Sequence, residues 1–142
     1  MLTIDRLELA AELDRLVTLL PRLTPRGGLS MVAAATLADL ERHGPRRITE
    51  LAETQGVTQP AMTGLVGRLA AGGLVERAPD PVDRRGVLVT VTAEGVAVLA
   101  ARRAARAAAL ADLLDLLDAD DHAALRAASG AITRLVSKGT AA

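Results

Sequence analysis

The sequence contains no cysteine, phenylalanine, tyrosine or tryptophan. Without cysteine, the chain can form no disulfide, no thiolate metal site and no cysteine-based oxidation sensor. Without aromatic rings, the volume of the core has to come from leucine, valine, isoleucine and alanine, which favours closely packed helices. The same absence removes base stacking as a means of binding, which argues against single-stranded nucleic acid as a ligand.

Net charge is absent as well. The 17 basic and 17 acidic side chains cancel, and every basic residue except Lys138 is an arginine. A balanced charge produces no overall field that would attract a polyanion. Positive charge nevertheless gathers locally at residues 42–47 and at the pair Arg84 and Arg85, while acids concentrate near residues 112–121. Contacts with a polyanion would therefore be local.

Targeting segments and catalytic constellations are also missing. The N-terminus lacks the basic start and apolar run of a signal peptide, and no stretch approaches the roughly 20 apolar residues that span a bilayer. We therefore expect a cytoplasmic protein, and 142 residues suggest one domain with its own core. The two histidines, His43 and His122, are far apart in the sequence, and no phosphate-binding or dinucleotide loop is visible. The sequence predicts no enzyme, no cofactor and no metal.

Residues 48–92 carry the most informative pattern. Thr49 and Thr58 are suited to cap two successive short helices, and Gln55-Gly56 supplies the turn between them. The second helix has Pro60 in its first turn, where a missing N–H costs nothing. One face of this helix forms an apolar stripe, with members three or four residues apart: Met62, Leu65, Val66 and Leu69.

The opposite face of this second helix is built from small residues, which are Pro60, Gly64, Gly67 and Ala71. Each interior glycine costs about 1 kcal/mol relative to alanine. Such a face is useful where a helix must approach another surface closely, as in a DNA major groove. A solvated helix that tolerates glycine explains the two glycines equally well, so both interpretations stay open.

Two β-type runs follow, residues 74–78 and 87–92, joined by the loop 79–86. Two prolines stiffen this loop, Gly86 permits a tight return, and Arg84 and Arg85 are adjacent at its tip. Arginine suits a narrow, negative minor groove and also grips phosphate. Asp83 is placed to hold one arginine by a charge-assisted bond. The alternative is a solvated, charged hairpin tip.

Helices are also predicted on both sides of this region. Residues 3–20 form an amphipathic helix, residues 93–117 a long helix, and Asp118 caps a last helix. Arg102, Arg103 and Arg106 fall together on the long helix, and we expect a solvated face there. The terminal helices carry more apolar surface than a monomer of this size can easily bury.

Five fragments carry a family resemblance. In chain order they are Glu50-Leu51-Ala52, residues 57–63, Arg68-Leu69 with residues 73–77, residues 80–85, and residues 91–95. Their order and spacing closely resemble the multiple-antibiotic-resistance-regulator (MarR) family. The resemblance implies a mainly α fold with a small β-wing, in which a winged helix-turn-helix is flanked by N- and C-terminal dimerisation helices. It implies one domain over residues 1–142, with a DNA-binding lobe at 29–92 and dimerisation helices and connector at 3–28 and 93–142.

The function implied by the resemblance is a homodimeric transcriptional regulator, a repressor, that reads a pseudo-palindromic double-stranded operator. The recognition helix would enter the major groove and the arginine-tipped wing the minor groove, and a small-molecule effector would release the DNA. The residues expected to bind DNA are Thr49, Thr58, Gln59, Pro60, Ala61, Thr63, Gly64, Arg68, Asp83, Arg84 and Arg85. The alternative is a winged-helix protein-interaction module without DNA binding, which the zero net charge and the glycine-rich face support.

Overall fold

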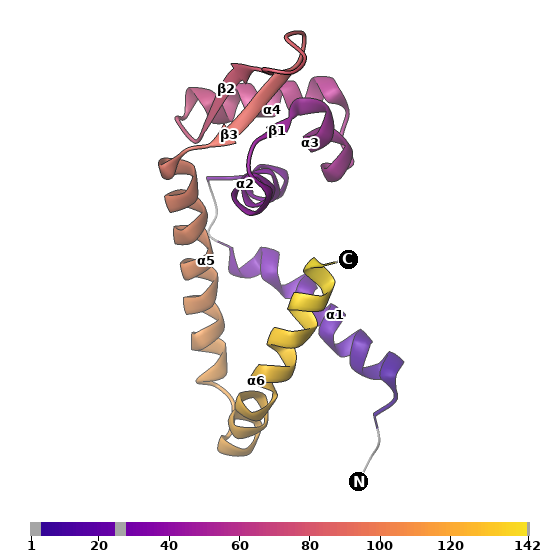
Figure 1. Ribbon diagram of the computed structural model, residues 1–142. Helices are drawn as coiled ribbons and strands as arrows, with labels where there is room; N and C mark the ends of the chain where they lie inside the picture. Colours follow the sequence, from indigo (N-terminus) through magenta and orange to yellow (C-terminus); the bar gives the residue numbers. More distant parts are fainter. Residues whose placement is uncertain (1–3, 25–27, 142) are drawn as a thin grey trace.

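The computed structural model describes residues 4–24 and 28–141. These residues form helices and one small sheet, in the order α1 (Arg6–Leu23), α2 (Met31–His43), β1 (Arg46–Arg47), α3 (Ile48–Gln55), α4 (Gln59–Ala71), β2 (Val75–Pro79), β3 (Val87–Val91), α5 (Ala93–Leu114) and α6 (Ala119–Thr140). The elements from α2 to β3, here called the winged lobe, gather at one end of an elongated molecule (Figure 1). Helix α5 runs away from the lobe and is contacted by α1, while α6 follows from its far end (Figure 1). The predicted mainly α fold with a small β-wing is confirmed.

The predicted helix starts are right in one motif helix and wrong in the other. Thr58 precedes α4, and its hydroxyl accepts a hydrogen bond from the Ala61 amide at 3.3 Å. Thr49 does not cap α3, because this helix begins at Ile48 with Arg47 in the cap position and no side-chain cap bond. The chain passes directly from β1 into α3, so Thr49 already lies in the first helical turn. Gly56 ends α3 with a left-handed φ of 64°, which permits the tight turn.

The sheet is antiparallel with the strand order β1-β3-β2. Val89 at the centre of β3 lies opposite Arg46 on one side and Arg77 on the other. Val89 and Val75 are buried, while the arginines beside them are not. The sheet therefore closes one side of the lobe, and the hairpin β2–β3 projects from it as the wing (Figure 1).

The hydrophobic core lies almost entirely inside the winged lobe. Its fully buried large side chains are Leu37, Leu40, Leu51, Met62, Val66 and Val89. The predicted α4 stripe is buried as a whole, and Leu99 is the one residue of α5 in the core cluster. Helices α1 and α6 bury none of their described residues. The lobe thus has a packed core of its own, to which α1 and α6 contribute no fully buried residue among those described.

The prediction of a solvated face at Arg102, Arg103 and Arg106 is wrong for Arg102 and Arg106, which are partly buried, and right for Arg103, whose side chain is 46 % exposed. Arg102 Nη1 donates to the carbonyl oxygen of Leu29 at 2.9 Å. Arg103 Nη1 forms an ion pair with Glu41 Oε2 at 2.8 Å. The reason is tertiary, since α2 packs against the first half of α5 and brings a carbonyl and a carboxylate within reach of two arginines.

Candidate nucleic-acid interface

Helix α4 divides cleanly into a buried and an exposed side. The buried side faces α3 and the sheet, and the other side carries exposed Gln59, Pro60, Thr63, Gly64 and Arg68. The Thr63 hydroxyl donates to the Gln59 carbonyl at 2.9 Å, which holds the first turn in shape. The long polar side chains on this exposed side are therefore Gln59 and Arg68, with small residues between them.

The glycines of α4 are not required by packing within the protein. A Cβ atom built on Gly64 would lie 3.5 Å from Nη1 of Arg68, which is ordinary contact with a flexible side chain. A Cβ on Gly67 would lie 3.9 Å from Nη1 of Arg77. Neither glycine has a left-handed φ. Because the fold itself tolerates alanine at both positions, the narrow outer face of α4 has no explanation inside the lobe.

A cleft of about 350 Å³ runs between the start of α3, the start of α4 and the wing. Its lining residues are Arg47, Ile48, Thr49, Gln59, Thr63, Asp83, Arg85, Gly86 and Val87. Five of them were predicted as site residues from the sequence, and three separate elements contribute them. The cleft therefore joins the polar start of α4 to the basic wing on one face of the lobe.

The two wing arginines have different surroundings. Arg85 lines the cleft, and its Nε atom lies 3.4 Å from Oδ1 of Asp83, which also accepts from the Arg85 amide at 3.1 Å. Arg84 borders a separate hollow with Pro79, Asp80 and Pro81. The contact that the sequence predicted between Asp83 and one arginine thus involves Arg85. The side chain of Arg85 remains 94 % exposed, so this contact orients it without removing it from solvent.

The base of the wing is fixed by Asp80, which is 3 % exposed. Its Oδ1 accepts from the Val82 amide at 2.9 Å, and its Oδ2 lies 2.5 Å from Nε of Arg47 as an ion pair that lacks hydrogen-bond alignment. The bond from Val82, aided by Arg47, outweighs burial and holds the pKa of the Asp80 carboxyl below its ordinary value of 3.8. An ionised Asp80 therefore ties the wing loop to β1.

Sequence reasoning placed Arg47 in a basic patch and did not include it in the site. Neighbouring strand residues point to opposite faces, so Arg46 and Arg47 diverge. Arg46 turns to Asp39 and Glu50, at 3.6 Å and 3.7 Å, while Arg47 turns to the wing and the cleft. The adjacent arginines gave no signal of which one would face the site, since this depends on the pairing of β1 with β3.

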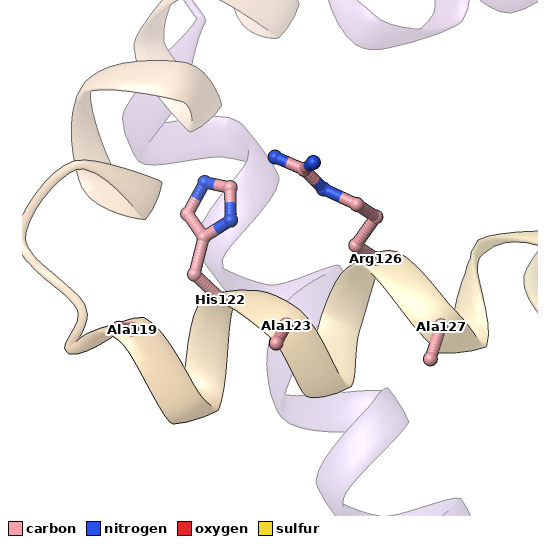
Figure 2. A pocket seen from close by; sticks show the side chains of 5 residues that line it. All are labelled: Ala119, His122, Ala123, Arg126 and Ala127. Atoms are coloured by element: carbon pink, nitrogen blue, oxygen red, sulfur yellow. The ribbon is translucent and has the colours of Figure 1, made fainter.

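A second hollow lies on the first turns of α6, at the end of the molecule opposite the wing (Figures 1 and 2). His122 and Arg126 project from the same side of the helix, and the other lining residues are alanines (Figure 2). Residues 4–24 and 28–141 contain no group of three potential metal ligands. Over those same ranges, no helix is both long and apolar enough to cross a membrane. The cleft at the wing, by contrast, combines polar groups from α3, α4 and the wing.

Comparison with known proteins agrees with this architecture. Residues 27–86 match the MarR family. The transcriptional repressor NicR of Pseudomonas putida is 42 % identical over 73 residues, which are 51 % of this chain and 46 % of NicR. The transcriptional regulator ML2140 of Mycobacterium leprae is 36 % identical over 98 residues, which are 68 % of each protein. The chain thus spans about half the length of NicR and two thirds of ML2140.

The similarity extends to the fold. The PcaV transcriptional regulator of Streptomyces coelicolor, solved in complex with its natural ligand, superposes with a TM-score of 0.57 at 25 % identity. This match covers 96 % of the present chain and 98 % of PcaV, so it includes the helices outside the lobe. Members of this family are DNA-binding transcription factors rather than enzymes. By its sequence profile, its relatives and its winged lobe, the chain belongs to the MarR family of transcriptional regulators.

Proposed function

We propose that this protein is a homodimeric repressor that binds a pseudo-palindromic operator and is released from it by a small-molecule effector. The observation that carries the proposal is the cleft at the wing, where Thr49, Gln59 and Arg85 come from three elements and share one face. Major-groove contacts by one helix and minor-groove contacts by a neighbouring arginine require such a shared face. NicR, a relative, is itself a repressor.

In this proposal α4 lies in the major groove. Gln59 and Arg68 are its long polar groups, Thr58, Ala61 and Thr63 make shorter contacts, and Pro60 and Gly64 allow close approach. On the wing, Arg84 enters the minor groove, and Asp83 aims Arg85 at a phosphate. Thr49, at the start of α3, contacts the DNA backbone. With two long polar side chains on the helix, DNA shape and wing contacts supply much of the selectivity.

Dimerisation is supported by the apolar side chains of the helices outside the lobe. Leu7 and Val17 on α1 are 70 % and 61 % exposed, and Leu135 and Val136 on α6 are 56 % and 59 % exposed. Apolar surface of this extent marks an interaction site. A two-fold dimer through α1 and α6 would cover it and present two copies of α4 to successive major grooves, about one helical turn apart.

Leu135→Glu tests the dimer. Leu135 is over half exposed, so the substitution leaves the core of the lobe untouched, but it places a charge on the proposed interface. Sedimentation velocity should show a dimer for the wild type and a monomer for the variant at micromolar concentration, with an unchanged circular dichroism spectrum. A wild type that sediments as a monomer would contradict the proposed assembly.

The effector has a candidate place between α2 and α5. A crevice of about 260 Å³ is lined by the apolar Met31, Ala34, Ala38 and Leu99 and by arginines of α5. Apolar walls with cationic groups suit a small aromatic or aliphatic anion. Because the crevice lies between the lobe and α5, a ligand there can favour one arrangement of the two over another. Addition of small carboxylates such as benzoate to a protein–DNA complex tests whether such ligands release the DNA.

DNA binding itself is tested by a mobility-shift titration with the promoter region upstream of the protein's own gene, at two salt concentrations. Specific binding that weakens steeply with salt is expected, because phosphate contacts release counterions. Absence of specific binding at both concentrations would favour the protein-interaction module instead.

A further inference from the structure

The start of α5 is hydrogen-bonded to and closely packed against the base of the wing. The Thr92 hydroxyl donates to the Gly73 carbonyl at 2.6 Å and accepts from the Gly95 amide at 3.1 Å. A Cβ atom on Gly95 would be 2.8 Å from Cγ2 of Val91 and closer still to the carbonyl oxygen of Leu74. The helix therefore rests directly on the wing's base, where no side chain fits between them.

A second set of contacts lies two turns further along α5. Arg102 holds the carbonyl of Leu29, which precedes α2, while Arg103 pairs with Glu41 near the other end of α2. Two adjacent arginines of α5 thus contact the two ends of α2. Leu99 lies between these two sets of contacts along α5. It is 3 % exposed and belongs to the core of the lobe. Rotation of α2 about its crossing with α5 would break one arginine contact or the other.

Together the two sets of contacts fix the direction in which α5 leaves the winged lobe. Gly95 and Arg103 are separated by roughly 12 Å along the helix axis, at 1.5 Å per residue. Contacts at both points hold the first turns of α5 in one orientation relative to the winged lobe. In the proposed dimer the remainder of α5 leads to the interface, so its direction from the lobe determines how far apart the two copies of α4 lie.

We propose that Arg102 and Arg103 are positioning residues that set the half-site spacing the dimer accepts, by holding both ends of α2 against α5. The inference rests on the proposed DNA binding and adds the contacts that determine the half-site spacing of the operator. Neither arginine needs to touch DNA for this role. A stabilising role alone would weaken binding to operators of every spacing by the same factor, whereas a positioning role changes which spacings are preferred.

The test is selection of binding sites from a randomised duplex library with the full-length protein, followed by sequencing and measurement of the distance between half-sites. The wild type should select one dominant spacing, near one helical turn. Arg103→Glu places like charges on α5 and α2, and spacings one base pair away should gain about 3-fold in share, the scale of one lost ion pair. Glu41→Arg combined with Arg103→Glu reverses the pair and should restore the wild-type distribution.

Arg102 is tested with Arg102→Met, which keeps the apolar stem without a donor, and Arg102→Lys, which keeps one. The methionine variant should broaden the spacing, and the lysine variant should broaden it less. Arg42→Ala is the matched control, because Arg42 is exposed beside Glu41 and has no ion pair within the described part of the chain. Its distribution should equal that of the wild type.

Two results distinguish failure of the positioning role from failure of the proposed DNA binding. If the wild type enriches a palindrome and both Arg103→Glu and Arg102→Met enrich it with the same spacing, the positioning role is refuted and DNA binding stands. If the wild type enriches no sequence, DNA binding fails and the positioning role fails with it.

Discussion

Gly64→Ala should move stability and DNA affinity in opposite directions. A Cβ at this position meets the flexible end of Arg68 at 3.5 Å, and Gly64 has helical rather than left-handed backbone angles. Alanine therefore adds about 1 kcal/mol to the free energy of unfolding through helix propensity alone. For a chain of this size that corresponds to a rise of about 3 °C in Tm.

The effect on DNA follows from the open side of α4. If this side lies against base edges, a new methyl group at the closest point separates the helix from the groove. The loss should match that of a mismatched base pair, about 1–3 kcal/mol, which is a roughly 5- to 150-fold increase in Kd. Anisotropy of a labelled operator duplex at fixed salt measures this, since the chain has neither tryptophan nor tyrosine to report binding.

Gly130→Ala on α6 is the matched control. A Cβ at Gly130 would lie 3.4 Å from Nη1 of Arg134, the same relation to an arginine four residues later that Gly64 has to Arg68. Both variants should gain stability, and only Gly64→Ala should lose affinity. A Gly64→Ala protein that is more stable and binds as tightly as the wild type would refute the placement of α4 against DNA.

Two further predictions concern the wing. Arg84→Ala should weaken operator binding by about 1–3 kcal/mol, the value of one good groove contact, and unchanged affinity in a titration at fixed salt would remove the wing tip from the interface. Asp80→Asn addresses stability against pH. Because the pKa of Asp80 is lowered in the folded protein, its carboxylate stabilises the fold above the ordinary value of 3.8, and this contribution disappears as the pH falls below 3.8 through the folded pKa. The wild type should therefore exceed Asp80→Asn in thermal stability at neutral pH and lose that advantage in acid, whereas parallel pH profiles would contradict the role of Asp80 in holding the wing.

Local pattern was enough to predict α4 and the two strands of the wing. The apolar stripe of α4, the cap at Thr58 and the strands of the wing depend on neighbours within a few residues. The structure has the stripe and the cap as predicted, and the strands within one residue of the predicted bounds. Thr49 failed as a cap because a residue type suited to capping does not reveal where the preceding strand ends. Arg102 failed as a solvated residue because the carbonyl that it contacts, that of Leu29, is more than sixty positions away in the chain.

The sequence by itself determined the order of helices and strands, the family and the residue types available to the candidate interface. These follow from periodicity, capping and spacing, which are properties of short stretches. Only the tertiary structure decided that Arg47 rather than Arg46 reaches the wing, that Arg85 and Arg84 have different surroundings, and that α5 is fastened to both ends of α2. The physical reason is that a side chain's partners depend on strand register and helix crossings, which arise when distant segments pack together.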